Sequence, residues 1–62
     1  LTNLSRAELI RSARLERGRK LLRTTDLSVS EVAYEVGFSA PSYFAKCYKD
    51  EFGITPNEDK LL

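Results

Sequence analysis

The stretch LSVSEVAYEVGFSAPSYFAKCYKDEFG, residues 27–53, decides the fold because it contains two amphipathic helical patterns separated by a glycine. Ser28 and Glu31 have the spacing of a capping box, which predicts the start of the first helix. Apolar residues then recur at the spacing of one helix face: Val29, Val32, Ala33 and Val36. Gly37 follows at once and suits the left-handed position that commonly ends a helix.

The second helical pattern follows Phe38, whose apolar ring we expect to turn inward. We expect Ser39 to cap this helix, with Pro41 inside its first turn. Gly53 ends the helix, and its apolar face consists of Phe44, Cys47, Tyr48 and Phe52. Two helices joined by a short glycine-containing turn form a helix-turn-helix, although the geometry alone leaves a plain pair of packed helices open.

A long helix is predicted upstream, because Ser5 and Glu8 form another capping box and no proline interrupts the chain before Arg23 or Thr24. Its apolar residues fall into two groups, whose mean directions differ by about 130° around the helix. One group is Leu9, Ile10 and Ala13, and the other is Leu15, Leu21 and Leu22, with Gly18 among them. The two directions predict contacts with two different cores, the alternative being one imperfect amphipathic face.

The end of the chain contains a third capping pattern, from Thr55 to Glu58, with Pro56 at the first helical position. This pattern predicts a short last helix. The carboxylates of this region and of the two preceding helices are expected on solvated helix faces: Glu31, Glu35, Asp50, Glu51, Glu58 and Asp59.

The composition narrows the class of protein. The 62 residues make one small domain or part of one, with no apolar run long enough to span a membrane and no signal peptide. A single cysteine, Cys47, and the absence of histidine exclude an intramolecular disulfide and a Cys/His metal site. We therefore expect a cytoplasmic domain without metal, cofactor or catalytic residues.

The charge is unevenly distributed along the chain. Residues 1–25 contain seven basic and two acidic side chains, whereas residues 26–62 contain three basic and seven acidic ones. This asymmetry is typical of a surface that binds nucleic acid, and it is equally typical of a solvated helix.

The run SEVAYEVGFSAPSYFAKCYKDEFGITPNE, residues 30–58, resembles the second helix-turn-helix of the AraC/XylS family of bacterial transcription regulators. The upstream run RSARLERGRKLL, residues 11–22, resembles the linker helix of that family. The resemblance implies an all-α, homeodomain-like half domain that begins as if cut from a longer protein. Residues 1–25 would form the linker helix with the end of a missing first helix-turn-helix, and residues 26–62 the second helix-turn-helix with a short last helix.

The sequence departs from the family pattern at two positions. Gly18 stands where the family more often has alanine, which suggests close approach of another helix. Asp59 stands where the family has an aromatic residue that docks the last helix on the core. We therefore expect Leu61 or Leu62 to take over this docking, or the tail to fray.

The predicted function is sequence-specific binding of double-stranded DNA within an AraC-type transcription factor, with residues 40–52 as the recognition helix in the major groove. Ser42, Lys46 and Lys49 lie opposite the apolar face of that helix. The predicted base contacts are Ala40, Pro41, Ser42, Tyr43 and Lys46. The resemblance independently implies base contact at four of them, Ala40 being the exception. The predicted backbone contacts are Lys49 and the helix starts at Ser28, Val29 and Ser39.

The alternative is a protein-interaction module, whose acidic half contacts RNA polymerase or another domain of the regulator. The apolar group formed by Leu9, Ile10 and Ala13 has no predicted partner within this chain. Exposed apolar surface of this kind favours association with another surface. We therefore expect self-association through the front of the long helix.

Overall fold

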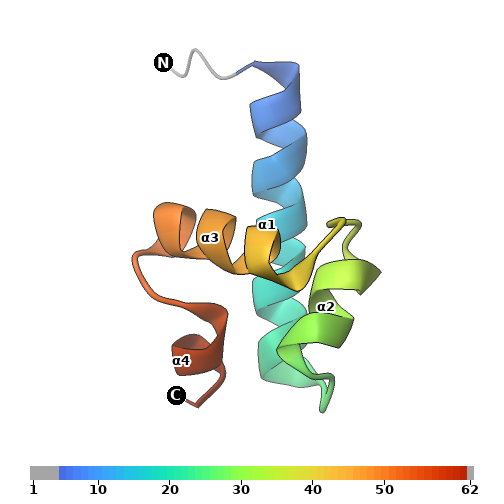
Figure 1. Ribbon diagram of the computed structural model, residues 1–62, viewed down its shortest axis with the longest axis vertical. Helices are drawn as coiled ribbons and strands as arrows, with labels where there is room; N and C mark the ends of the chain where they lie inside the picture. Colours follow the sequence, from blue (N-terminus) through green and yellow to red (C-terminus); the bar gives the residue numbers. More distant parts are fainter. Residues whose placement is uncertain (1–4, 62) are drawn as a thin grey trace.

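The computed structural model describes residues 5–61, which form four helices and no strand. They are α1 (Arg6–Thr24), α2 (Val29–Glu35), α3 (Pro41–Phe52) and α4 (Pro56–Leu61). Helix α1 forms the long axis of the molecule, and α3 crosses it near its middle (Figure 1). This arrangement confirms the predicted all-α fold. Within the described residues, no helix is both long enough and apolar enough to cross a membrane.

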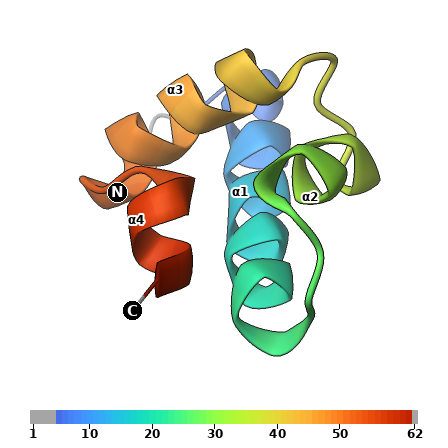
Figure 2. The same ribbon diagram turned by 60° about the horizontal axis from the view of Figure 1, so that its bottom comes forward.

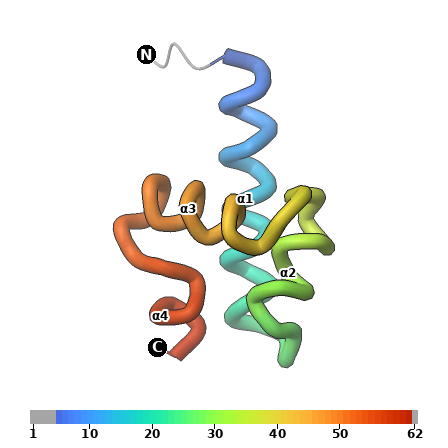
Figure 3. The backbone as a smooth tube through the Cα atoms, in the orientation of Figure 1, coloured from blue at the N-terminus to red at the C-terminus, as the bar shows by residue number. Residues whose placement is uncertain are grey.

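Helices α2 and α4 lie on opposite sides of the second half of α1, and α3 lies across it (Figure 2). The chain leaves the lower end of α1, returns upward through α2, crosses in α3 and descends into α4 (Figure 3). The first half of α1 extends beyond these three helices in Figure 1. The site is therefore positioned by the second half of α1, against which the helix-turn-helix packs.

Capping boxes begin α1 and α2 as predicted, each with a serine hydroxyl accepting from a backbone N–H and a glutamate accepting in return. At α4, Thr55 and Glu58 make the same reciprocal bonds. The prediction that Ser39 caps α3 is wrong, because the cap residue is Ala40, which makes no side-chain cap bond. The reason is Pro41, which excludes the preceding residue from the helical region and so fixes the helix start at itself.

The turn between α2 and α3 has the geometry of a Schellman motif. The Phe38 N–H donates to the Ala33 carbonyl at 2.9 Å, and the Gly37 N–H donates to the Tyr34 carbonyl at 3.1 Å. Gly37 has a φ of 97°, a left-handed conformation that favours glycine. Phe38 is 7% exposed, which confirms that its ring turns inward.

The core lies between the second half of α1 and the two helices of the helix-turn-helix. Its buried apolar residues are Leu15, Leu22, Val32, Ala33, Val36, Phe38, Phe44 and Tyr48. Gly18 is buried at the crossing of α1 and α3, where an added Cβ would lie 3.0 Å from the Phe44 ring. The predicted close approach at Gly18 is thus confirmed, and α3 provides it.

Asp59 docks α4 on the rest of the molecule through polar contacts. It is 3% exposed, so the prediction that it lies on a solvated face is wrong. Its Oδ1 accepts from Nη2 of Arg23 at 2.9 Å, and its Oδ2 lies 3.4 Å from Nε of Arg19. Oδ2 also accepts a short hydrogen bond from the Tyr48 hydroxyl. A carboxylate with three partners therefore replaces the expected apolar dock.

Leu61 does not take over this docking, because it is 87% exposed, and the other predicted substitute, Leu62, lies outside the described residues. The contacts of Asp59 come from α1 and α3, so they anchor α4 to both of these helices. The remaining carboxylates of the predicted solvated set are exposed: Glu31, Glu35, Asp50, Glu51 and Glu58.

Candidate nucleic-acid interface

The outer face of α3 is polar and exposed. Ser42, Lys46 and Lys49 are all exposed, whereas Phe44 and Tyr48 on the opposite side are 0% exposed. This confirms the predicted division of α3 into an inward aromatic face and an outward face with two lysines. The contacts of the outward residues with DNA stay a prediction.

The start of α3 lies at the edge of this outward face. Ala40 and Pro41 are half-buried, and Ser39 is exposed. Since proline has no N–H and Ala40 has no side-chain acceptor, the first free backbone donors of α3 are those of Ser42 and Tyr43. Donors of this kind at a helix start suit an anionic partner.

The start of α2 differs from that of α3. The Ser28 N–H already donates to Glu31 Oε1 at 2.8 Å, and the Ser28 hydroxyl accepts from the Glu31 N–H at 3.1 Å. These bonds lower the pKa of Glu31, so its carboxylate stays charged at the helix start. The predicted backbone contact at Ser28 and Val29 therefore depends on the Val29 N–H, beside a negative charge.

Tyr43 belongs in part to the folded structure. Its ring centroid lies 5.6 Å from that of Phe38, and its side chain is 45% exposed. Its hydroxyl oxygen accepts a hydrogen bond from Nη1 of Arg11 at 3.4 Å. The hydroxyl therefore lies at the surface, on a ring that packing holds in place.

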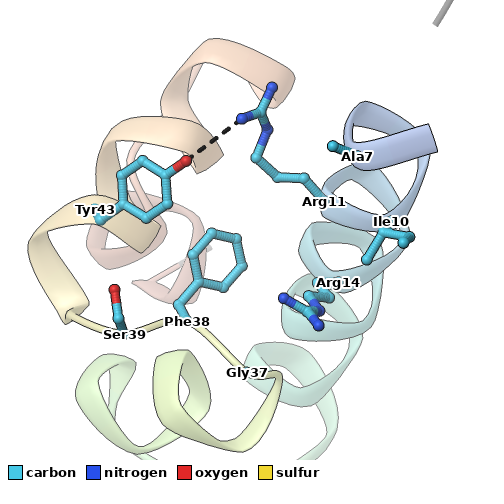
Figure 4. Close-up of a pocket in the computed structure, with 8 residues that line it drawn as sticks. All are labelled: Ala7, Ile10, Arg11, Arg14, Gly37, Phe38, Ser39 and Tyr43. Carbon is cyan, nitrogen blue, oxygen red and sulfur yellow. Dashed lines mark hydrogen bonds between the residues drawn. The ribbon is translucent and has the colours of Figure 1, made fainter. Parts of the chain in front are cut away.

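Two α1 residues that the sequence reasoning missed lie beside the start of α3. Arg11 and Arg14 line a hollow of about 460 Å³ between α1 and the turn before α3 (Figure 4). The spacing of Arg11 contained a signal, because it lies four residues before the buried Leu15 and so on the same face of α1. Its partner Tyr43, 32 residues further along the chain, carried no such signal.

The described residues offer no metal centre, since no group of three or more histidine, cysteine, aspartate or glutamate side chains comes together between residues 5 and 61. Cys47 is half-buried with a free thiol, on the side of α3 that partly packs on the core.

The exposed lysines of α3, the free N–H groups at its start and the arginines of α1 lie on neighbouring elements. Together they can offer hydrogen-bond donors and positive charge to an anionic surface.

The fold and this exposed helix define a helix-turn-helix DNA-binding domain. The pattern of a family described as "Helix-turn-helix domain" matches residues 1–60. The chain belongs to this family, which is the helix-turn-helix of the AraC/XylS transcription regulators. The match favours DNA binding over a protein-interaction module.

The chain is also similar to curated proteins and to a solved structure. The chain is 40% identical over 57 residues to histidine kinase P4 of Formosa agariphila, covering 92% of this chain. It is 47% identical over 49 residues, 79% of this chain, to the HTH-type transcriptional regulator CdhR of Pseudomonas aeruginosa. The C-terminal domain of AraT, a response regulator from Geobacillus stearothermophilus, superposes with a TM-score of 0.88 at 31% identity, covering 94% of this chain and 48% of that one.

The chain spans a small part of the two curated relatives, 4% of the kinase and 15% of CdhR. The similarity therefore concerns one short segment of each of these proteins.

Proposed function

We propose that this domain directs a bacterial AraC-type transcription regulator to its operator by inserting α3 into the major groove of double-stranded DNA. The observation that carries the proposal is the division of α3 into a fully buried aromatic face and an exposed face with Ser42, Lys46 and Lys49. An exposed polar face on a helix whose other side is fixed by packing is the arrangement that major-groove reading requires. The proposed activity is binding alone, without catalysis, and it takes place in the cytoplasm, where chromosomal DNA lies.

The proposed base contacts follow the distance of each residue from the helix start. Lys46 is exposed on the side of α3 opposite the buried Phe44 and Tyr48, so its ammonium group can reach the acceptors of guanine. Ser42 offers a hydroxyl nearer the helix start, and Ala40, Pro41 and the exposed part of the Tyr43 side chain offer apolar contact to a thymine methyl group.

The proposed backbone contacts flank these base contacts. Lys49 is exposed nearly one turn beyond Lys46, where the helix leaves the groove and phosphate is nearer than base edges. Ser39, at the exposed start of α3, is proposed to contact phosphate through its hydroxyl or N–H. At the start of α2, Ser28 and Val29 are proposed to contact phosphate through the Val29 N–H, because the Ser28 N–H donates to Glu31.

The two lysines provide a matched test in the full-length protein. We expect Lys46→Ala to relax the preference for one base pair, with a loss of about 1–3 kcal/mol of discrimination, because its contact distinguishes bases. We expect Lys49→Ala to weaken all sequences alike and to reduce the salt slope by about one, because phosphate carries no sequence information. The measurement is binding to a wild-type-selected operator and its single-base variants at two salt concentrations.

Each lysine acts as the control for the other, because both are exposed on one helix and neither contributes to the core. A Lys46→Ala variant that weakens every operator equally would contradict the proposed insertion of this face. Unfolding of the domain by Lys46→Ala would also contradict it, since an outward residue is not needed for folding.

A further inference from the structure

The first half of α1 brings positive charge to the start of α3. Arg11 lies one turn before the buried Leu15, on the face of α1 that packs against α3 but beyond the core. Its Nη1 donates to the Tyr43 hydroxyl oxygen at 3.4 Å, a bond that Figure 4 shows. The guanidinium group therefore lies at the edge of the outward face of α3.

The Tyr43 hydroxyl is well placed to act together with Arg11. Its ring is tilted by 56° against the buried ring of Phe38, so packing fixes the direction of the hydroxyl. The oxygen accepts from Arg11, which leaves the hydroxyl proton free to donate. The Arg11 guanidinium has four further N–H donors after this bond. Tyr43 and Arg11 thus present donors from two helices at one place.

The surroundings of this pair are positive on the side of the turn before α3. The hollow there is lined by two arginines and no carboxylate: Ala7, Ile10, Arg11, Arg14, Gly37, Phe38, Ser39 and Tyr43. On the other side, toward the middle of α3, the pair borders one lysine and two carboxylates: Lys46, Asp50 and Glu51. Within residues 5–61, the ion pairs of the arginines join Arg19 and Arg23 to Asp59, and neither Arg11 nor Arg14 takes part. The charge of the first half of α1 is therefore available to a partner.

We propose that Arg11 and the Tyr43 hydroxyl together bind a backbone phosphate of the duplex whose groove α3 enters. The inference rests on the proposed function, because only an inserted α3 brings a phosphate strand to this edge of the helix. The planar fork of arginine matches two phosphate oxygens, and bonds from a charged donor are short and strong. DNA is favoured as the occupant because the hollow beside these donors extends to Ser39, at the exposed start of α3.

The experiment compares two charge-removing variants of the full-length protein. Arg11→Gln removes the proposed contact, and Lys20→Gln removes an exposed charge nine residues further on, about 180° around α1 from Arg11. Each protein is titrated with the operator duplex that the wild type selects from a randomised library, and with a scrambled duplex of equal length, at several salt concentrations. Thermal unfolding of each variant checks that the fold is unchanged.

We expect Arg11→Gln to weaken both duplexes by about fivefold at roughly 0.15 M salt and to reduce the salt slope by about 0.9, the effect of one phosphate contact. Lys20→Gln should change affinity by less than about twofold, because a distant exposed charge is screened. Arg11→Lys should retain the wild-type slope, since it retains the charge. Tyr43→Phe, which keeps the ring and loses the hydroxyl, should weaken both duplexes without altering the slope.

An unchanged salt slope in Arg11→Gln would overturn the inference, as would a loss confined to the operator, which would make Arg11 a reader of bases. Equal effects of Arg11→Gln and Lys20→Gln would also overturn it, because they would reflect a general attraction between positive side chains and DNA. Failure of the proposed function has a different signature: the wild type selects no operator, or Lys46→Ala leaves the base preference unchanged. The inference alone fails when the wild type selects an operator and the salt slope of Arg11→Gln equals that of the wild type.

Discussion

The two halves of α1 are parts of one continuous helix, yet they have different surroundings. Residues 15–24 contain the buried Leu15, Gly18 and Leu22 and pack against the other three helices. In residues 6–14, Leu9 and Ile10 are 53% and 45% exposed. The arginines differ in the same way, because Arg19 and Arg23 of the second half bind Asp59, whereas the partner of Arg11 within residues 5–61 is the uncharged hydroxyl of a tyrosine.

The difference shows that packing of the second half stabilises the helix, whereas the first half is available to bind another surface. The stability of a short helix in water comes chiefly from tertiary packing, which here acts on the second half. The first half is extended by its capping box and by continuity with the packed turns. Its exposed apolar and positive side chains are therefore more important for contacts with other surfaces than for this core.

The largest expected effect is a contrast between two leucine truncations. Leu22→Ala should lower the free energy of unfolding by about 2–5 kcal/mol, because it leaves a cavity in a core where Leu22 is 4% exposed. Leu9→Ala should change it by less than about 0.5 kcal/mol, because Leu9 is 53% exposed and lies outside the core cluster. Urea unfolding followed by circular dichroism measures both. Similar losses for the two variants would show that the halves of α1 are not energetically distinct.

The next effect concerns the polar dock of α4. Asp59→Ala should lower the free energy of unfolding by about 1–3 kcal/mol, because the buried Tyr48 hydroxyl loses its acceptor. The ion pairs add less, since the side chains of Arg19 and Arg23 are 37% and 49% exposed. Asp59→Asn should cost less than alanine, because its amide oxygen still accepts from Tyr48. A loss below that of Leu9→Ala would contradict a structural role for this dock.

The same site predicts a pH dependence. The hydrogen bond from Tyr48, followed by that from Arg23, lowers the pKa of Asp59 below its ordinary value of 3.8. A lowered pKa in the folded state contributes stability that is complete above the ordinary value and is lost as the pH falls through the lowered one. We therefore expect the wild type to lose stability below about pH 4, relative to Asp59→Asn, in urea unfolding at a series of pH values. If the free energy of unfolding changed with pH in the same way for the two proteins, Asp59 would not be the group responsible.

Local patterns predicted most of the fold. The capping boxes, the glycine at the α2–α3 turn and the two apolar directions of α1 depend on residues a few positions apart, so the sequence reveals them. The start of α3 was misplaced by one residue, because the conformational effect of Pro41 decided it rather than the capping preference of Ser39.

Contacts between distant residues could not be predicted in this way. Arg23 and Asp59 are 36 residues apart, and Arg11 and Tyr43 are 32 residues apart. Their pairing depends on the crossing of α1, α3 and α4, which no single helical pattern specifies. A buried aspartate is also contrary to the usual preference of its residue type, and only its partners explain it. The exposed face of α3 was predictable, because it is the complement of an apolar stripe.

The first half of α1 should mediate association of this chain. Leu9 and Ile10 are exposed neighbours on α1, so covering them removes apolar surface from water. We expect weak, concentration-dependent self-association, which Ile10→Glu should abolish and Lys20→Glu, at another exposed position of α1, should not. Sedimentation equilibrium of the 62-residue chain measures this effect. Monomers at every concentration, for the wild type as well as for Ile10→Glu, would refute the idea.

The smallest expected effect isolates packing from helix propensity by making opposite substitutions in the two halves of α1. Ala13→Gly, at an exposed position, should cost about 1 kcal/mol, the intrinsic preference of a helix for alanine. Gly18→Ala gains the same preference, but its Cβ would lie 3.0 Å from the Phe44 ring.

That ring cannot easily move away from Gly18, because Phe38 and Tyr48 pack on it with centroid distances of 5.2 and 5.6 Å. Overpacking costs about 1–3 kcal/mol, and a single added carbon belongs to the lower part of that range, which offsets the gain in propensity. We therefore expect Gly18→Ala to leave the domain slightly less stable, by less than about 1 kcal/mol, in the same urea experiment. Stabilisation equal to the cost of Ala13→Gly would mean that α3 yields at the crossing. The second half of α1 would then be packed less tightly than its buried residues indicate.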